Sequence, residues 1–197
     1  LCGFILSFVS SNIISIICFK SSFSSGLNTT ISSTLFKNSG LKTLFNSFIA
    51  IALILPGHAL AAEPQVHRDL AYVEPADASR RLDVYAPANG TDHPVLAWIH
   101  GGGWRQGDKL GVQHKPQAFV DKGFVFVSVN YRFVPQVTVK EMTGDIAKAI
   151  KWVHDNAKEY GGSPDTIFAA GHSAGAHLAA LVCTDDCYLK AETLSLS

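Results

Sequence analysis

The chain has 197 residues, of which 47% are hydrophobic and 16% are charged, and its sixteen Lys and Arg balance its sixteen Asp and Glu. A zero net charge without a basic stripe argues against nucleic acid as a partner. The composition excludes a disordered chain and predicts one globular domain with a sizeable core.

Charge is distributed unevenly along the chain. Residues 1–61 contain three lysines and no Asp, Glu or Arg, whereas all acidic residues lie from Glu63 onward. Residues 1–33 are first apolar and then Ser/Thr-rich, but they lack the arginine of a transit peptide. The chain begins with Leu, and its only methionine is Met142. We therefore interpret residues 1–33 as an unexplained or non-native extension and exclude them from the expected fold.

Residues 34–61 are predicted to be a secretory signal peptide. Two lysines precede the apolar stretch 44–55, and the small-residue sequence Ala-Leu-Ala at 59–61 forms a cleavage site. The apolar run is about twelve residues long, which is short of the roughly 20 that a membrane-spanning helix needs. We expect cleavage before Ala62, a secreted or periplasmic mature chain and no membrane span after cleavage.

Strand patterns and helix patterns alternate in the rest of the chain. Residues 81–85 alternate polar and apolar side chains, as a half-buried strand does. Residues 95–99, 124–129 and 166–170 are short, unbroken apolar runs, which fit strands covered on both faces of a parallel sheet.

A long helix is predicted between Met142 and Tyr160, where apolar residues recur at helical spacing. Two glycines at 161–162 should end it, and Pro164-Asp165 should turn the chain into the next strand. Residues 62–197 are thus expected to form an α/β fold, a mostly parallel central sheet with helices on both faces. Ligands of such sheets bind beyond the carboxyl ends of the strands.

The first motif at such a strand end is GHSAG at residues 171–175, directly after the strand predicted at 166–170. A strand-to-helix turn this tight requires residues without bulk two positions before and after its apex, and Gly171 and Gly175 meet that need. The turn holds Ser173 in a strained backbone conformation with its hydroxyl above the sheet. The unpaired N–H groups at the helix start suit a developing negative charge.

The second motif is HGGGW at residues 100–104, directly after the strand predicted at 95–99. Three successive glycines let the backbone approach a ligand and direct N–H groups inward. With the N–H of Ala174, those of Gly102 and Gly103 could form an oxyanion hole, in which one donor is worth about 3–4 kcal/mol. The spacing fits neither G-x-G-x-x-G nor a P-loop, which disfavours a nucleotide site.

The two motifs resemble the α/β-hydrolase family. From Leu82 onward the chain contains LDVYAP, WIHGGGW, VNYR and GHSAGAHLAA in the family's order. It is most similar to small esterases and lipases with an HGGGW loop, of the hormone-sensitive-lipase-like, kynurenine-formamidase-like and BD-FAE-like groups. The resemblance implies a carboxylic ester hydrolase for small-molecule esters, without cofactor or metal, since water is the second substrate. The site residues that it implies are Ser173 as the nucleophile, Gly102, Gly103 and Ala174 as oxyanion donors, and His100, Gly101, Trp104, Gly171, His172 and Gly175 as supporting residues.

The sequence departs from the family after Ser173. The triad of this fold follows the order serine, acid, histidine, but the 24 residues after Ser173 contain one histidine, His177, and two aspartates, Asp185 and Asp186. We expect His177 to pack or face solvent, because its helix leads away from the turn, and the two aspartates to end that helix. The chain should therefore be the first part of a hydrolase, with negligible activity by itself and an unpaired strand edge that makes it marginally stable.

Two other functions stay open. A kynurenine-formamidase-like enzyme would keep the fold and cleave an N-formyl amide, whereas a truncated remnant would be a binding module or have no function. Labelling by a fluorophosphonate separates these classes, because both complete enzymes should react at Ser173 and a remnant should not.

The remaining polar residues are expected to be structural. Arg132 should anchor a loop, while Trp104 either lines an acyl pocket or braces the glycine loop. One buried and one exposed thiol are favoured for Cys183 and Cys187 over a small disulfide, because a helical (i, i+4) pair suits disulfide geometry poorly. A metal site is disfavoured as well, because two cysteines do not complete one. We expect four isolated histidines to be solvated and two tryptophans to lie in the core, namely His67, His93, His114, His154, Trp98 and Trp152.

Overall fold

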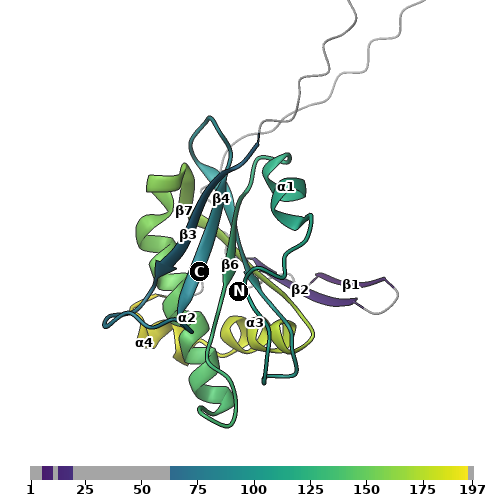
Figure 1. Cartoon of the computed structure of the whole chain (residues 1–197), viewed down its shortest axis with the longest axis vertical. Coiled ribbons are helices and arrows are strands. Elements are labelled where there is room, and N and C mark those ends of the chain that lie inside the picture. Colours follow the sequence, from purple (N-terminus) through teal and green to yellow (C-terminus); the bar gives the residue numbers. More distant parts are fainter. Residues whose placement is uncertain (1–5, 11–12, 20–62, 195–197) are drawn as a thin grey trace, which may run out of the picture. The chain divides into compact units, whose positions relative to one another are not determined.

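The structure is a computed structural model that describes the backbone of residues 6–10 and 13–19 and the whole of residues 63–194 (Figure 1). The signal peptide predicted at 34–61 lies outside the described residues. The described part of the chain forms one sheet with helices on both of its faces.

Seven strands form the sheet, in the order β1-β2-β7-β5-β6-β4-β3. Strands β5, β6 and β7 are parallel, and they form the centre of the sheet, as their apolar runs predict. Strands β4 and β3 pair antiparallel on one side, and β2 and β1 pair antiparallel on the other. The bounds are Leu6–Ser10 for β1, Ile13–Phe19 for β2, Gln65–Ala71 for β3, Arg81–Ala86 for β4, His93–Ile99 for β5, Val125–Val129 for β6 and Gly162–His172 for β7.

The helices bury two separate apolar clusters against the sheet. One cluster holds side chains of α2, α3 and α4, and the other holds Val120 of α1 with Trp98 and Phe126 of the sheet. Figure 1 accordingly shows α1 apart from the other helices. The helix bounds are Lys115–Val120 for α1, Val139–Asn156 for α2, Ala174–Thr184 for α3 and Cys187–Ala191 for α4, with a 3₁₀ turn at Ala157–Tyr160.

The long helix differs from its prediction at both ends. It begins at Val139, because Thr138 and Glu141 form a capping box that satisfies the first N–H groups. The α-helix ends at Asn156, and a 3₁₀ turn continues to Gly161, which terminates it at a φ of 73°. The turn predicted at Pro164-Asp165 is wrong, because both residues lie inside β7.

Three expectations about exposure and pairing are wrong. Strand β4 is buried over almost its whole length, because β3 and β6 flank it and its side chains belong to apolar clusters on both faces of the sheet. Its polar-apolar alternation therefore does not mark a solvent face. His93 is half-buried, with Nδ1 2.9 Å from the carbonyl oxygen of Gly123 and Nε2 3.0 Å from that of Asn89. The outer edge of β7 is paired, since β2, in the segment excluded from the expected fold, runs antiparallel along it.

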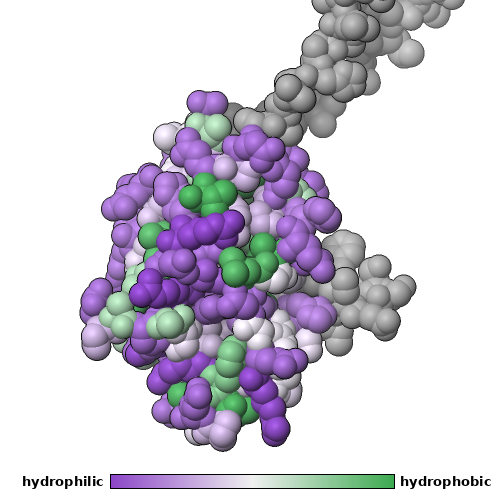
Figure 2. Space-filling view, in the orientation of Figure 1, coloured by the Kyte–Doolittle hydropathy of each residue, from purple (hydrophilic) through white to green (hydrophobic). Residues whose placement is uncertain are grey.

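The face of the molecule that Figure 2 shows is mainly hydrophilic, with hydrophobic residues scattered over it. Val66 and Leu110 are its exposed large hydrophobic residues. None of the helices in the described ranges has both the length and the apolar character needed to cross a membrane.

Candidate active site at the strand-to-helix turn

Ser173 lies at the turn between β7 and α3, in the conformation that the sequence predicts. Its φ is 52° and its ψ is −117°, a strained combination for a residue with a side chain. Ser173 occupies the N-cap position of α3, yet its side chain makes no capping hydrogen bond. Serine is normally a good N-cap because its hydroxyl binds a free N–H group. The exposed hydroxyl of Ser173 is therefore free to contact a ligand.

The two glycines of the GHSAG motif are required, because backbone atoms lie too close to leave room for a Cβ atom. A Cβ atom at Gly171 would lie 2.5 Å from the backbone of Gly175. A Cβ atom at Gly175 would lie 2.1 Å from the carbonyl oxygen of Ile99 and 2.4 Å from that of His100. The first turn of α3 thus packs directly on the end of β5. This contact brings the two motifs together, although they are far apart in the sequence.

The glycine loop approaches the turn closely. A Cβ atom at Gly101 would lie 2.8 Å from the carbonyl oxygen of His172 and 3.3 Å from the Cβ atom of Ser173. Gly102 and Gly103 have φ angles of 130° and 60°, values that L side chains rarely adopt. The structure therefore places the backbone of the loop beside Ser173.

His100 is buried at the base of the loop, where it contacts backbone and aromatic groups. Its Nδ1 lies 2.7 Å from the carbonyl oxygen of Gly101, and its ring stacks on that of Tyr131 at 4.5 Å. The Tyr131 hydroxyl donates a 2.9 Å hydrogen bond to the carbonyl oxygen of His100. Burial lowers the pKa of His100, although the Gly101 carbonyl and the charge of Asp108 oppose that effect. The neutral imidazole is thus favoured at this position.

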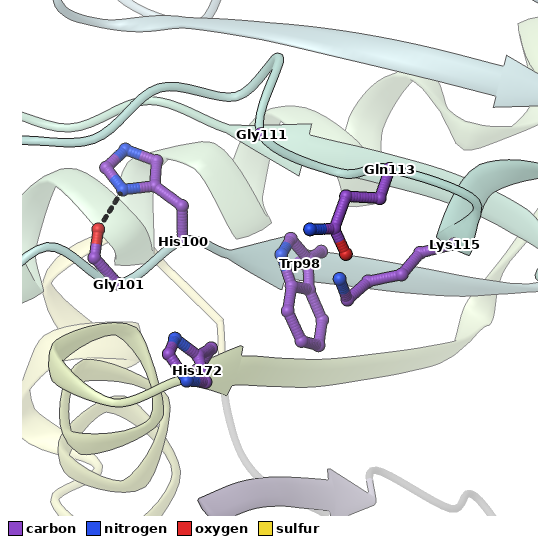
Figure 3. Close-up of a pocket in the computed structure, with 7 residues that line it drawn as sticks. All are labelled: Trp98, His100, Gly101, Gly111, Gln113, Lys115 and His172. Carbon is purple, nitrogen blue, oxygen red and sulfur yellow. Dashed lines mark hydrogen bonds between the residues drawn. The ribbon is translucent and has the colours of Figure 1, made fainter. Parts of the chain in front are cut away.

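A pocket of about 240 Å³ opens beside the loop, on the Trp98 face of the sheet (Figure 3). The Lys115 ammonium lies 5.1 Å from the centre of the Trp98 ring, a distance typical of a cation–π contact. Ser173 is not part of the lining, so the pocket lies next to the turn and not over it. The lining residues are Trp98, His100, Gly101, Gly111, Gln113, Lys115 and His172.

Trp104 and His177 pack against each other. Their rings meet edge to face with centroids 5.6 Å apart, and His177 is otherwise exposed, as expected for a residue that packs or faces solvent. The carbonyl oxygen of Trp104 accepts a 2.9 Å hydrogen bond from the N–H of Val134. These contacts brace the glycine loop, which is one of the two roles considered for Trp104.

A buried charge cluster beneath the loop was missed by the sequence analysis. Lys109 is 4% exposed, and its Nζ lies 2.7 Å from Oδ1 of Asp83 and 2.9 Å from Oδ1 of Asp69. Burial by itself would lower the pKa of Lys109, but the hydrogen bonds that its ammonium donates to both carboxylates outweigh burial and raise the pKa. Asp83 is fully buried on β4. The sequence signal that could have indicated this pair is Asp83 itself, a carboxylate between the apolar residues Leu82 and Val84.

Arg132 anchors the segment after β6, as predicted. Its guanidinium donates two 2.7 Å hydrogen bonds to the Asp145 carboxylate of α2, which is 1% exposed. Cys183 and Cys187 are not joined by a disulfide. Asp185 caps the end of α3, and Asp186 precedes α4, so both aspartates lie where the helix ends.

Within residues 63–194, no histidine or carboxylate forms a hydrogen bond with the Ser173 hydroxyl. No group of three His, Cys, Asp or Glu residues in the described ranges is arranged to hold a metal ion. The arrangement can therefore offer a hydroxyl and backbone N–H groups to a substrate.

The chain is similar to known esterases over most of its described length. The BD-FAE family model matches residues 82–193. A probable isoprenylcysteine alpha-carbonyl methylesterase of Arabidopsis thaliana is 35% identical over 134 residues, which cover 65% of this chain and 28% of that protein. Esterase LipQ of Mycobacterium tuberculosis is 41% identical over 111 residues, which cover 53% of this chain and 24% of that protein.

Solved structures of esterases are also similar to this chain. Esterase B of Lactobacillus rhamnosis matches with a TM-score of 0.59 and 26% identity, over 68% of this chain and 44% of that one. A further structure of that esterase contains a tributyrin phosphonate inhibitor. This chain spans about a quarter of the length of the curated relatives and less than half of esterase B. Since the family model matches more than half of the chain, the chain belongs to the BD-FAE family of esterases and has the α/β-hydrolase fold.

Proposed function

We propose that the protein is a serine hydrolase that cleaves carboxylic esters through an acyl-enzyme on Ser173. The observation that carries the proposal is the backbone of Ser173, whose φ of 52° coincides with an exposed hydroxyl that does not cap its own helix. A strained residue persists only where the surrounding structure enforces it, and such strain gathers at active sites. The names of the curated relatives, which are esterases and methylesterases, support the same activity.

In this mechanism, Ser173 Oγ attacks the acyl carbon of the ester, and the carbonyl oxygen becomes an oxyanion. We assign the donors to that oxyanion as the backbone N–H groups of Gly102, Gly103 and Ala174. The assignment is supported by the position of the glycine loop beside Ser173 and by the free N–H groups at the start of α3. The alcohol leaves with a proton, and water then releases the acid and restores the serine.

The described residues supply neither a base for Ser173 nor an acid to orient that base. His177 packs on Trp104, and Asp185 and Asp186 lie at the far end of α3. A triad serine without its base retains only the contribution of the oxyanion hole and of binding. We therefore expect the 197-residue chain by itself to hydrolyse p-nitrophenyl esters at a negligible rate, with base and acid supplied by residues outside it.

The test uses the protein as its gene encodes it, treated with a fluorophosphonate probe and assayed with p-nitrophenyl butyrate. We expect one labelled peptide, which contains Ser173, and hydrolysis that falls roughly a millionfold in Ser173→Ala. Ser163→Ala is the matched control, because Ser163 lies at the start of β7, the strand whose other end leads into Ser173, and its loss should leave both readouts unchanged.

Labelling at another serine, or hydrolysis that survives in Ser173→Ala, would refute the assignment. An N-formyl aryl amide, assayed in parallel, separates an ester hydrolase from a formamidase with the same nucleophile. Absence of both labelling and turnover in the gene product would instead indicate a non-catalytic remnant.

A further inference from the structure

The glycine loop lacks a regular backbone ladder to hold it in place. Five residues between Gly102 and Gln113 have φ angles in the left-handed region, including Trp104 and Gly107. The carbonyl oxygen of Gly102 accepts two 3.2 Å hydrogen bonds from the next turn of the loop. Backbone N–H groups stabilise an oxyanion only if they are fixed before the reaction, so other contacts must hold this segment.

Lys109 is the residue at which the loop returns to the sheet, and it is fixed at four points. Its N–H donates a 2.6 Å hydrogen bond to Oδ1 of Asn130, and its carbonyl oxygen accepts a 2.7 Å bond from Ser128 Oγ. Its ammonium lies between the carboxylates of Asp83 and Asp69. The loop is thereby tied to both β4 and β6.

The Asp83 carboxylate is built to receive this lysine. It is fully buried, and Oδ1 accepts a 2.9 Å bond from the N–H of Asp69 in addition to the contact with Lys109. Arg68 contacts Oδ2 at 3.1 Å, but half of the Arg68 side chain is exposed. Lys109 is therefore the buried cation that balances the charge of Asp83. Loss of Lys109 would leave the buried Asp83 carboxylate with only the half-exposed Arg68, and loss of Asp83 would leave the buried ammonium with only the exposed Asp69.

The position of Lys109 is transmitted to the site through Gly107. A Cβ atom at Gly107 would lie 2.3 Å from Nδ1 of His100 and 2.4 Å from the carbonyl oxygen of Gly101. The segment that ends at Lys109 thus packs directly against the start of the glycine loop. Because packed segments transmit displacement, a shift of Lys109 would move the backbone beside Ser173.

We propose that the Lys109–Asp83 ion pair is a positioning device that holds the N–H groups of the glycine loop in register with Ser173. Lys109 and Asp83 act through the loop and do not touch substrate. The inference rests on the proposed function, since it assigns the loop to the oxyanion.

The experiment compares Lys109→Met, the double variant Asp83→Asn/Lys109→Met and the wild-type gene product. Lys151→Met is the matched control, since it breaks an exposed lysine–aspartate pair on α2, away from the loop. Four quantities are measured for each protein. They are kcat and KM for p-nitrophenyl butyrate, hydrogen exchange of peptides that cover residues 101–107, and the urea midpoint of unfolding.

We expect Lys109→Met to lower kcat about a hundredfold with KM within about twofold, as for catalytic groups displaced by about 1 Å. Exchange should accelerate in peptides 101–107 and not throughout the chain. The double variant removes both buried charges, so its urea midpoint should recover towards the wild-type value while kcat stays low. Lys151→Met should match the wild type in kcat, KM and exchange, and its urea midpoint should change little.

A purely structural role predicts a different outcome, in which kcat recovers with the urea midpoint in the double variant. That result, or an unchanged kcat in Lys109→Met, would overturn the proposal. If the wild-type protein neither hydrolyses esters nor reacts with the fluorophosphonate, the proposed function fails. The exchange of residues 101–107 then decides whether the ion pair anchors the loop, and uniform or unchanged exchange rejects it.

Discussion

At the scale of single residues, the site depends on glycines, which have no side chain and so permit close contacts. Gly175 lets α3 rest on the carbonyl groups at the end of β5, and Gly101 lets the loop touch the turn at Ser173. Neither contact adds much buried apolar area. Both contacts instead allow close approach. A Cβ atom at either glycine would push apart two elements that must lie against each other to form the site.

Gly175→Ala tests this requirement. Its Cβ atom would lie 2.1 Å from the carbonyl oxygen of Ile99, so α3 and β5 must move apart. We expect a loss of about 1–3 kcal/mol in the free energy of unfolding, measured by urea denaturation. Gly144→Ala is the control, because Gly144 lies inside α2 with nothing within 4 Å of an added Cβ atom.

Gly144→Ala should stabilise the protein by about 0.5–1 kcal/mol, since alanine favours the helix and restricts the unfolded chain. If Gly175→Ala is as stable as the wild type, α3 and β5 can move apart at little energetic cost, and the prediction is wrong.

The roles of individual residues show most clearly what can and cannot be predicted from the sequence. Ser173 and its flanking glycines could be predicted, because the turn fixes their spacing within five positions. The pairing of Asp83 with Lys109 could not, because the two residues meet only after β4, β6 and the glycine loop have assembled. Local alternation made Asp83 look exposed, whereas burial depends on what covers the strand.

At the scale of elements, Arg132 joins the end of β6 to α2. The Asp145 carboxylate is 1% exposed and receives both guanidinium hydrogen bonds on the inner side of the helix. A bidentate pair of this kind fixes orientation as well as distance. The pair therefore sets how α2 lies against the sheet that carries the site.

Arg132→Met should lower the free energy of unfolding by about 3 kcal/mol, because it leaves the Asp145 carboxylate buried without its partner. Lys151→Met removes a lysine from an exposed pair on the same helix and should cost less than about 1 kcal/mol. Chemical denaturation of both variants measures the difference. Equal losses in the two variants would show that the Arg132 pair is solvated and weak.

Elements were predicted well where the sequence pattern is local. The central strands appear at the predicted apolar runs, and α2 follows its apolar stripe. The short α1 and the antiparallel direction of β4 were not predicted, since helix α1 has fewer than two turns and strand direction is a property of the assembled sheet. Pro164 was expected in a turn, but it lies near the start of β7.

At the scale of the whole molecule, the free energy of unfolding should depend on pH. Burial would raise the pKa of Asp77, but hydrogen bonds from Ser79 and Arg80 outweigh it and lower the pKa to about 2. Hydrogen bonds from the Thr138 backbone and side chain likewise lower the pKa of Glu141. Both carboxylates therefore stabilise the fold above their unfolded pKa, and this contribution disappears as they become protonated in the folded state.

We expect the urea midpoint to fall as the pH decreases from about 4 to about 2, the interval between the unfolded and folded pKa of Asp77. Asp77→Asn removes the titrating group, so its midpoint should be lower near pH 6 and should decrease less over that interval. Unfolding curves recorded at each pH provide the measurement. Parallel curves for the two proteins would show that Asp77 contributes nothing to the acid sensitivity.

The contact between Gly175 and the end of β5 also has a consequence for synthesis of the protein. The chain leaves the ribosome from its N-terminus, so the glycine loop emerges long before Ser173 and α3. Contacts between distant residues form slowly, because a long loop must close first. Ser173 therefore meets the glycine loop only when nearly the whole described chain has been synthesised, and the loop of a nascent chain is exposed before its packing partner is available.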